Sequence, residues 1–442
     1  MFDLELVKEL GGTIVGDIDV AKITDIHNMY QEITIGSIYI AIKGANQDGI
    51  NFVQQAIDRG AIAIITHKKI DINIPQIVVD NTVNFVIRYA TKKINQYKNK
   101  IIGVVGSVGK TTLRHTLISL LPGKKIYTIK SFNNKFSISM SMMLLDNNYD
   151  FAIIEMGTNF PGEILDLSKM IEPDYVLINT IGLEHSEFLG GLKDILKEEY
   201  SVLKHTKKMS ISSLNNKSIL EEYESMDLLN DKIENYFLPS YQKSGNKIEI
   251  MIDGKIVEFE INSRDFALIN TVIFTIFLAN KLGLDINEII EKTKNLHNVC
   301  HRNSLIKVGN LRIFDCSFNC NPTSFYNLIN NIENKCSLFF GQMKELGIFS
   351  KEEHYKCFEK IYENPLIENA YIISDFVIPD EFNSKIKKFK QTDINEITGD
   401  VYIQGSRSSK MENIVFQLIN LSFFSLYKSI KGNDFTERFI FH

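Results

Sequence analysis

A glycine-containing stretch, GVVGSVGKTT at 103–112, has the residue types that bind phosphate groups. It follows the apolar pair Ile101 and Ile102 and precedes a helix-like run at 112–121. In such a strand, loop and helix, the N–H groups at the helix start face an anion, and the helix dipole adds to the attraction. Val104 occupies the first glycine position of the strict P-loop pattern, so an ordinary tight turn with a solvated lysine is the alternative. We expect the stretch to bind a nucleotide.

Individual residues of this stretch suit different parts of a nucleotide. Gly106 and Gly109 have no Cβ, so the backbone can approach phosphate oxygens closely. Lys110 would reach the outer phosphates, and the Thr111 hydroxyl would bind a magnesium ion.

Two further polar residues follow apolar segments that are predicted to be strands. Glu155 ends the segment FAIIE, where a carboxylate could hold magnesium directly or through water, or could simply start a surface loop. His185 lies in the loop NTIGLEHSEFLGG (179–191). This histidine could be a ligand or a hydrogen-bonded loop residue.

A third group of polar residues lies near position 315. Asp315 ends the apolar segment LRIFD, and Asn319 and Asn321 follow it. Short polar side chains here can bind ribose hydroxyls or adenine edges, or they can build an Asx turn. Arg302 would be a phosphate ligand from outside the glycine loop, or a charge in a linker.

The composition is that of a globular protein, with 44% hydrophobic and 23% charged residues among 442. This length suggests two to four domains of roughly 100–200 residues each. A net charge of −5 provides no basic field for nucleic acid. Residues 1–12 do not resemble a signal peptide, and the most apolar run, 266–280, is shorter than the ~20 residues that cross a bilayer. We expect a cytoplasmic protein that binds neither nucleic acid nor a membrane.

The cysteines are odd in number and form no CxxC pair, so we expect reduced, mostly buried thiols and no zinc site. They are Cys300, Cys316, Cys320, Cys336 and Cys357.

Alternating strand and helix patterns predict an α/β chain with three domains, at 1–97, 98–303 and 304–442. The first is predicted to be a small α/β domain, followed by a charged linker at 92–100. Its elements are strands at 36–42 and 61–66 and a helix at 51–59.

The central domain is predicted to be a doubly wound P-loop-type domain with a parallel sheet. Strands are expected at 101–105, 126–129, 151–155, 175–180 and 209–212, and helices at 162–170, 192–203 and 266–282. Alternating segments on both sides of Asp253 and Gly254 predict a β-hairpin at 247–261. Ligands of such sheets bind at the carboxyl ends of the strands, where the stretch 103–112 would lie.

The C-terminal domain is predicted to be a second, Rossmann-like domain without a glycine-rich fingerprint of its own. Strands are expected at 311–316, 336–340, 370–374 and 401–404, and helices at 324–332, 351–362 and 409–425.

Several motifs, in their order along the chain, resemble those of the Mur ligases. They are GSVGKTT (106–112), IIEMG (153–157), NTIGLEH (179–185), HRNSLIKVGNLRIFDCSFNCNPTS (301–324), FGQMKELG (340–347) and GSRSSKME (405–412). The N-terminal stretch ITIGSIYIAIKGANQDGINF (33–52) resembles the same family. Because the motifs span nearly the whole chain in order, the joint match is more specific than the glycine loop alone.

The resemblance implies an ATP- and Mg²⁺-dependent amide ligase. The γ-phosphate of ATP would pass to a substrate carboxylate, and an amine would attack the acyl phosphate. The sequence is most similar to family members that add D-alanyl-D-alanine to UDP-MurNAc-tripeptide in peptidoglycan precursor synthesis. The implied partners are small molecules, and nothing in the sequence requires more than a monomer.

The family's site residues can be carried over onto matching positions of this sequence. The implied catalytic residues are Lys110, Glu155, His185 and Glu199, and the implied metal ligands are Thr111, Glu155, His185 and Glu199. The implied ATP-binding residues are Gly106, Ser107, Gly109, Lys110, Thr111, Thr112, Asn270, Arg302, Asp315, Asn319 and Asn321. The implied residues for the carboxylate substrate are Lys43, Asp48, Gly49, Asn133 and Asn134.

Position 199 departs from the family pattern, in which a carbamylated lysine bridges the metals. Glu199 keeps a carboxylate-like end and is predicted to serve a metal, directly or through water. The alternative is a solvated helix face, because Lys197, Glu198 and Glu199 form a run of charges. On a helix, Lys197 would point away from the face that residue 199 occupies.

Other departures lie mostly on the side of the carboxylate substrate. Asp25-Ile26-His27 stands where the family has an Asp-Ser-Arg that binds the uracil nucleotide. Ile26 cannot hydrogen-bond a nucleotide, and His27 is a weaker phosphate partner. The helix at 265–282 lacks a His-Asn pair near adenine, for which Asn270 is a stand-in. A Mur-like ligase for another acid and amine, and a nucleotide-binding protein without catalysis, are therefore the alternatives.

Overall fold

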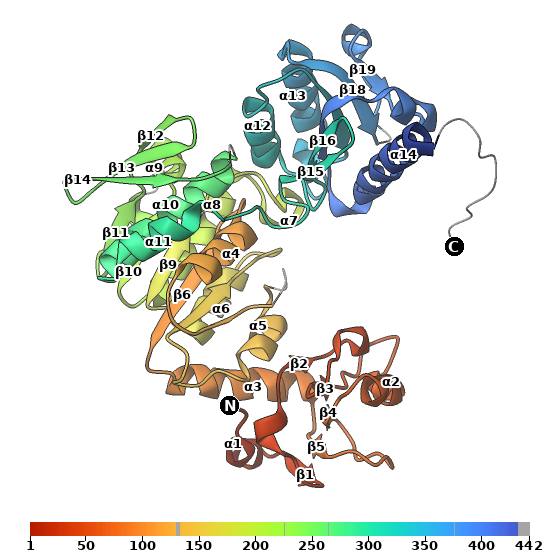
Figure 1. The fold of residues 1–442 in the computed structure, drawn as a ribbon. Helices are drawn as coiled ribbons and strands as arrows, with labels where there is room; N and C mark the ends of the chain where they lie inside the picture. The colour runs from red at the N-terminus through yellow and green to blue at the C-terminus, as the bar shows by residue number, and fades with distance from the viewer. Residues whose placement is uncertain (130–132, 225, 264, 375, 432–442) are drawn as a thin grey trace. The chain divides into compact units, whose positions relative to one another are not determined.

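The computed structural model describes residues 1–431 apart from 130–132, 225, 264 and 375 (Figure 1). The chain forms two compact units. The first consists of Met1–Gly106, Leu117–Asn179 and Lys197–Leu238, and the second of Ser107–Thr116, Thr180–Leu196 and Pro239–His442. The end of the predicted third domain, 432–442, lies outside the described residues.

The N-terminal part of the first unit is a small sheet in the order β1-β5-β4-β3-β2. Its strands are β1 (Thr13–Val15), β2 (Ile26–His27), β3 (Ile38–Ile40), β4 (Ala63–Thr66) and β5 (Gln76–Val78), and its helices are α1 (Leu4–Glu9), α2 (Val53–Asp58) and α3 (Thr82–Gln96). β1 is antiparallel to β5, and the other pairs are parallel. Ile38 and Ile40 pack in a core with α3, whereas Tyr39 between them packs in a core with α2. This alternation gives the sheet an apolar layer on each face.

Helix α3 corrects the predicted linker at 92–100, because it continues through Gln96. Its buried side includes Tyr89, Lys93 and Ile94. The buried positions of the helix fall at i, i+3, i+4, i+7, i+8, i+11 and i+12 counted from Thr82, so they lie on one helix face. The ammonium group of the buried Lys93 donates a hydrogen bond to the Met1 carbonyl oxygen (3.1 Å). The charged segment is therefore helical because one face of it is buried.

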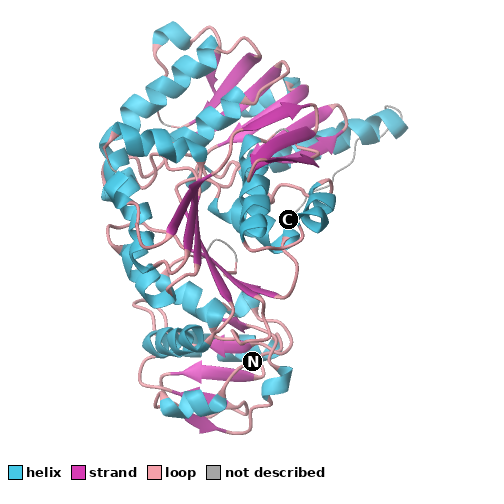
Figure 2. Ribbon diagram, turned by 90° about the vertical axis from the view of Figure 1, so that its left-hand side faces the viewer, coloured by secondary structure: helices cyan, strands magenta, loops and turns pink. Residues whose placement is uncertain are grey.

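The central sheet, also in the first unit, is parallel throughout, with the order β11-β10-β9-β6-β8-β7 (Figure 2). Its strands are β6 (Lys100–Val105), β7 (Lys125–Tyr127), β8 (Phe151–Glu155), β9 (Tyr175–Ile178), β10 (Met209–Ser212) and β11 (Glu234–Phe237). Along the chain these strands alternate with the helices α4 (Lys110–Leu120), α5 (Lys135–Met142), α6 (Glu163–Ile171), α8 (Leu192–Tyr200) and α9 (Leu214–Glu222), and the short α7 (Ser186–Leu189) precedes α8. The predicted alternation of strand and helix is confirmed.

The second unit contains an antiparallel sheet of β12 (Tyr241–Ser244), β13 (Lys247–Ile252) and β14 (Lys255–Glu260), followed by α10 (Phe266–Lys281) and α11 (Ile286–Thr293). The predicted hairpin is confirmed, with Asp253 (φ 47°) and Gly254 (φ 78°) in its turn. Two consecutive positive φ angles are typical of a type I′ turn, whose twist matches that of the strands. Helix α10 is largely buried, as predicted, and its N-cap Asp265 accepts a hydrogen bond from the Ala267 N–H.

The C-terminal sheet has the order β15-β16-β20-β17-β18-β19. Its strands are β15 (Ser304–Val308), β16 (Leu311–Cys316), β17 (Cys336–Gly341), β18 (Ile367–Ile373), β19 (Ile386–Lys388) and β20 (Gly399–Gln404), and its helices are α12 (Pro322–Asn330), α13 (Ser350–Glu363) and α14 (Glu412–Lys431). β15 is antiparallel to β16, and the other strands are parallel. One core contains residues of α12 and α13, and a second contains residues of α14. The sheet is therefore covered on both faces, and the loops after β16, β17 and β20 leave from the same edge.

The predicted α/β class is confirmed by these sheets, and no described helix is both long and apolar enough to cross a bilayer. All five cysteines are free thiols, of which Cys300 is exposed.

Candidate nucleotide site

The glycine loop follows β6 and leads into α4, as the sequence predicts. Gly106 has φ 121°, and a Cβ at this position would lie 2.9 Å from the Asn179 carbonyl oxygen, so both backbone conformation and space require glycine. Gly109 has φ 82°. The N–H groups of Ser107 and Val108 both donate to the Thr180 carbonyl oxygen (3.0 Å each). The loop is thus held in a defined conformation, with the start of α4 directly after it.

Glu199 lies on α8 in the first unit and is fully buried, so the predicted alternative of a solvated helix face is wrong. Its Oε2 accepts a hydrogen bond from the Gly106 N–H (2.9 Å). The carboxylate therefore contacts the first residue of the glycine loop. Lys197 is exposed, as expected for the other side of the helix. The neighbouring Glu198 has a different partner, because it accepts from the Gly162 and Ile164 N–H groups (2.7 and 2.9 Å) at the start of α6.

Lys110, the first residue of α4, forms an ion pair with Glu184 in the second unit (Nζ–Oε1 3.1 Å). Both side chains are mostly buried. Burial raises the pKa of Glu184, although the charges of Lys110 and His185 act in the opposite direction. The sequence analysis did not identify Glu184, which is 74 residues from its partner. Its only sequence signal is its position immediately before His185 in the motif NTIGLEH.

His185 has a left-handed backbone (φ 48°) and bonds through Nδ1 to Glu345 Oε2 (2.7 Å). The Glu187 N–H donates to the carbonyl oxygen of Glu345 (3.0 Å). Burial lowers the pKa of His185, but the hydrogen bond to Glu345 and the charges of Glu184 and Glu345 outweigh it, so the pKa is raised. The same hydrogen bond lowers the pKa of Glu345. Because Nδ1 is engaged, Nε2 is the ring nitrogen that could bind a ligand.

Glu345 comes from the motif FGQMKELG, for which sequence analysis gave no role. The motif GSRSSKME contacts it, since the Ser406 hydroxyl donates to the Gln342 carbonyl oxygen (2.6 Å). His354 of α13 also holds this loop, because its Nε2 accepts from the Met343 N–H (3.0 Å). The two motifs are therefore joined at the carboxyl ends of β17 and β20.

Arg302 joins the glycine loop to the C-terminal strands within the second unit. Its Nη2 donates to the Thr111 hydroxyl oxygen (3.1 Å), and its guanidinium carbon lies 3.9 Å from the centre of the Phe318 ring. The guanidinium of Arg407 lies 5.4 Å from the centre of the same ring. Two guanidinium groups therefore lie near the same aromatic ring, and that of Arg302 contacts the hydroxyl that is predicted to bind magnesium.

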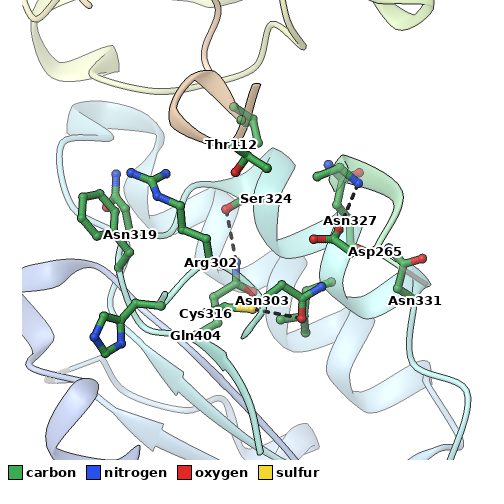
Figure 3. Close-up of a pocket in the computed structure, with 16 residues that line it drawn as sticks. Thr112, Asp265, Arg302, Asn303, Cys316, Asn319, Ser324, Asn327, Asn331 and Gln404 are labelled. Atoms are coloured by element: carbon green, nitrogen blue, oxygen red, sulfur yellow. Dashed lines mark hydrogen bonds between the residues drawn. The ribbon is translucent and has the colours of Figure 1, made fainter. Parts of the chain in front are cut away.

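A cavity of about 120 Å³ adjoins the glycine loop (Figure 3). It is lined by residues of the loop and α4, of the start of α10 and of the C-terminal sheet edge: Val108, Gly109, Thr112, Asp265, Ala267, His301, Arg302, Asn303, Cys316, Phe318, Asn319, Ser324, Asn327, Leu328, Asn331 and Gln404. Of the predicted ATP ligands, Gly109, Thr112, Arg302 and Asn319 line it. The structure thus brings the loop together with the predicted C-terminal nucleotide segment.

Seven other predicted ATP ligands do not line this cavity: Gly106, Ser107, Lys110 and Thr111 of the glycine stretch, and Asn270, Asp315 and Asn321 elsewhere. The Asp315 carboxylate is fully buried and bonds to Nδ1 of His301 (2.7 Å), whose ring does line it. Asn321 caps α12, where its Oδ1 accepts from the Ser324 N–H (2.8 Å). Asn270 lies further along α10, and the cavity is lined by Asp265 and Ala267 instead. His301 and Asp265 are therefore site residues that the sequence analysis did not identify.

Glu155 is the last residue of β8 and is only 2% exposed. Its N–H donates to the Thr128 hydroxyl oxygen (3.1 Å), which fixes the end of the strand. Among the described residues, no three of His, Cys, Asp and Glu lie close enough together to hold a metal ion by themselves. The oxygen atoms of Thr111 and Glu155 nevertheless suit Mg²⁺, which takes few protein ligands beside substrate phosphates.

The predicted substrate residues of the N-terminal sheet form a tight turn. Lys43 and Asp48 form a β-bridge, and the Asp48 carboxylate accepts from the Ile50 N–H (3.1 Å). A Cβ on Gly49 would lie 2.6 Å from the Ile42 nitrogen, so only glycine fits there. Burial, together with the charge of Asp48, raises the pKa of Tyr39 to about 12, and its hydroxyl donates to the Gly49 carbonyl oxygen (2.9 Å).

The remaining substrate positions are held by backbone contacts in the first unit. The Asn133 carbonyl oxygen accepts from the Gly157 N–H (3.1 Å), and Asn134 caps α5. Ile26, which replaces a polar residue of the family, is buried in the core of the N-terminal sheet. His27 lies 3.3 Å from a carboxylate oxygen of Glu32.

Two family descriptions match consecutive parts of the chain: "Mur ligase family, catalytic domain" at 31–105 and "Mur ligase middle domain" at 104–271. Together with the parallel sheet and the lysine-bearing glycine loop, they place the protein in the class of ATP-dependent amide ligases. The chain belongs to the Mur ligase family. The membership of the Mur ligase family that the sequence motifs predict is therefore confirmed.

Individual relatives extend this similarity over most of the chain. The UDP-N-acetylmuramoyl-tripeptide–D-alanyl-D-alanine ligase of Rickettsia prowazekii (strain Madrid E) is 26% identical over 421 residues, which are 87% of this chain and 93% of that protein. The enzyme of the same name from Haemophilus influenzae is 22% identical, over 94% of this chain and 97% of that protein.

Solved structures have the same fold. A crystal structure of MurF from Acinetobacter baumannii has a TM-score of 0.78 at 20% identity, covering 95% of this chain and 99% of that one. MurF ligase from Thermotoga maritima in complex with ADP has a TM-score of 0.74 at 21% identity, covering 92% and 100%. Both structures share the fold of this chain.

Proposed function

We propose that the protein joins D-alanyl-D-alanine to UDP-MurNAc-tripeptide in peptidoglycan precursor synthesis, with ATP as phosphoryl donor and Mg²⁺ as cofactor. The observation that carries this proposal is the similarity, over 87% and 94% of the chain, to two proteins named for this activity. The glycine loop with Lys110 and Arg302 beside it supports ATP as the donor.

The proposed reaction has two steps. A carboxylate oxygen of the tripeptide attacks the γ-phosphorus of ATP, so that ADP leaves and an acyl phosphate forms. The amino nitrogen of the dipeptide then attacks the acyl carbon, the bond from this carbon to the phosphate oxygen breaks, and the nitrogen loses a proton. Such a transfer depends mainly on positioning and on compensation of negative charge. Lys110 would supply this charge by exchanging Glu184 for phosphate oxygens.

The proposed metal ligands are Thr111, Glu155, His185 and Glu199. Mg²⁺, when bound, supplies positive charge to the transferred phosphoryl group. Arg302 positions the Thr111 hydroxyl through its hydrogen bond, and Glu345 orients the His185 ring. The contact with Glu345 leaves Nε2 of His185 for a ligand.

A ligase for another acid and amine is the second candidate, and the N-terminal sheet supports it. Ile26 lies in the apolar core and His27 beside Glu32, so neither side chain reproduces a serine and arginine that bind a nucleotide. This candidate shares the phosphoryl chemistry and differs only in the substrates.

Phosphate release from ATP, measured with varied acid and amine partners, tests these candidates. Release that requires both UDP-MurNAc-tripeptide and D-alanyl-D-alanine is the expected result. Release only with other acids or amines would support the second candidate. ATP binding without release for any pair would indicate a nucleotide-binding protein without catalysis.

The domain limits 1–97, 98–303 and 304–442, the monomeric state and the cytoplasmic location are parts of the same proposal. Sedimentation of the purified chain would test the monomer.

A further inference from the structure

Arg407 is a positively charged residue beside the candidate site and has no assigned part in the proposed reaction. It lies in the turn that follows β20, and its side chain is exposed. Among the described residues, its guanidinium has no hydrogen-bond or ion-pair partner, although it lies 5.4 Å from the centre of the Phe318 ring. The N–H donors of this planar group are therefore left for a ligand or for water.

The backbone of Arg407 is held in place by the residue before it. The hydroxyl and the N–H of Ser406 both donate to the Gln342 carbonyl oxygen (2.6 and 3.3 Å). The turn is thus fixed on the loop at 341–347, which also carries Glu345. The guanidinium is therefore presented beside the candidate site by a turn of defined conformation.

Arg302 and Arg407 share one aromatic neighbour but differ in their surroundings. Arg302 lies 3.9 Å from the centre of the Phe318 ring, lines the cavity beside the glycine loop and donates to the Thr111 hydroxyl oxygen. Arg407 does not line this cavity. Arg302 thus belongs to the phosphate end of the site, whereas Arg407 lies beside it and outside the cavity. Two like charges this close repel each other, so an anion next to Arg407 is favoured.

The proposed reaction includes an anion to which no residue has been assigned. D-alanyl-D-alanine has a free carboxylate, and its amino group must reach the acyl carbon next to the transferred phosphate. An extended dipeptide spans roughly 7 Å, so its carboxylate lies near the phosphate end of the site but not at it. A guanidinium can bind a carboxylate through two parallel hydrogen bonds. The position of Arg407, beside Arg302 but outside the cavity, suits this carboxylate.

We propose that Arg407 binds the terminal carboxylate of the amine substrate and thereby selects amines that carry one. This inference rests on the proposed function, because it requires an amine that attacks an acyl phosphate. The class of amine is then an amino acid or a short peptide with a free carboxylate. A neutral amide in place of the carboxylate loses the ion pair, and its NH₂ group brings a donor against the N–H groups of the arginine.

Steady-state kinetics with D-alanyl-D-alanine and with its amide, in which a neutral carboxamide replaces the carboxylate, test this proposal. We expect kcat/KM of the unmodified protein to be at least ~10-fold higher for the dipeptide, mainly through a lower KM. Arg407→Met, which removes the charge, should bring the two values within about twofold by weakening the dipeptide alone. Arg88→Met is the matched control, because Arg88 is also exposed but lies on α3.

Calorimetry with a non-hydrolysable ATP analogue distinguishes the carboxylate from the phosphates as the anion that Arg407 binds. We expect Arg407→Met to bind the analogue as tightly as the unmodified protein, because Lys110 and Arg302 remain. A loss of affinity for the analogue in this variant would assign Arg407 to the phosphates and would overturn the proposal.

Each kinetic outcome has a distinct meaning. Equal use of the dipeptide and its amide by the unmodified protein, or a preference that Arg407→Met leaves unchanged, would overturn the role of Arg407 while the proposed function stands. No phosphate release with the dipeptide would refute the proposed function itself. Should Arg407→Met not fold, Arg407→Lys, which keeps the charge but not the planar donor group, should have an intermediate preference. A preference as large as that of the unmodified protein would contradict binding by the guanidinium.

Discussion

The ammonium group of Lys110 has an anionic partner within the chain. Glu184 lies 3.1 Å away, and both side chains are mostly buried. A buried lysine is unfavourable without an opposite charge, so this pair keeps the ammonium group in place beside the glycine loop. In the proposed function a phosphate group would take the place of Glu184, so the charge of Lys110 would stay compensated.

Lys110→Ala is expected to lower turnover by ~10²-fold or more, since removal of one preorganised charge donor has effects of this size. The measurement is phosphate release at saturating substrates. Lys197→Ala is the matched control, because Lys197 is exposed on α8 and should leave turnover unchanged. Near-normal turnover of Lys110→Ala would refute the role of this lysine.

Glu199 has a carboxyl group without any chemical modification, and this group already contacts the Gly106 N–H (2.9 Å). If it replaces a carbamate, turnover should be the same in buffer freed of CO₂ and in buffer with added bicarbonate. The phosphate-release assay under both conditions checks this expectation. A several-fold rise with bicarbonate would show that a carbamylated lysine is needed after all.

At the scale of elements, the loop at 341–347 connects separate parts of the second unit. Glu345 contacts His185, Ser406 contacts Gln342, and His354 accepts from the Met343 N–H. Nδ1 of His354 also donates to the Ser350 carbonyl oxygen (2.7 Å), so the ring is neutral with a fixed tautomer. The geometry of the candidate site therefore depends on a buried histidine outside it.

This histidine predicts a pH dependence of stability. Burial lowers the pKa of His354 below its ordinary value of 6.5, so the neutral form is favoured in the folded protein. Its contribution is fully present above pH 6.5 and is lost as the pH falls through the lowered pKa. His354→Leu should lower the free energy of unfolding by about 1–3 kcal/mol at pH 8, because the Met343 N–H loses its acceptor.

Urea unfolding of both proteins between pH 5 and 8 measures this effect. The difference between them should shrink below pH 6.5. A His354 difference that does not change with pH would contradict the assignment.

Two buried strands of the central sheet could be predicted from the sequence to the residue. β8 (Phe151–Glu155) and β10 (Met209–Ser212) were predicted with their observed bounds, because both are fully buried strands of a parallel sheet. β12 (Tyr241–Ser244) has the sequence YQKS and is mostly exposed, so no apolar pattern marks it. β19 (Ile386–Lys388) is too short for a period to be recognised.

The candidate site also has parts that a local sequence pattern marks and parts that no local pattern marks. The glycine loop has a local signal, because its residue types and spacing suffice to predict it. The partners of its residues have no such local signal, because Lys110 and Glu184 are 74 residues apart and Arg302 and Thr111 are 191 residues apart. Such pairs depend on the order of strands in the sheets, which no local pattern encodes. The family resemblance supplied Arg302, but it gave no role to Glu184, Glu345 or Arg407.

At the scale of the whole molecule, a nucleotide in the cavity would contact segments that are far apart in the chain, from Val108 to Gln404. Unfolding must separate these segments, so a ligand that binds only the folded chain stabilises it. The gain is about 2.7 kcal/mol at a ligand concentration 100 times the Kd. A non-hydrolysable ATP analogue with Mg²⁺ should therefore raise the unfolding temperature progressively with its concentration.

Thermal unfolding followed by fluorescence measures this rise, and three comparisons locate its origin. EDTA should reduce the rise, because the triphosphate then loses the Mg²⁺ that the proposed function gives it. Lys110→Ala should reduce it further, since the outer phosphates lose their charged partner. Lys197→Ala should reproduce the behaviour of the unmodified protein, as its side chain is exposed. An unfolding temperature that stays constant at every analogue concentration would mean that the glycine loop does not bind adenine nucleotides, and the proposed ligase chemistry would then be refuted.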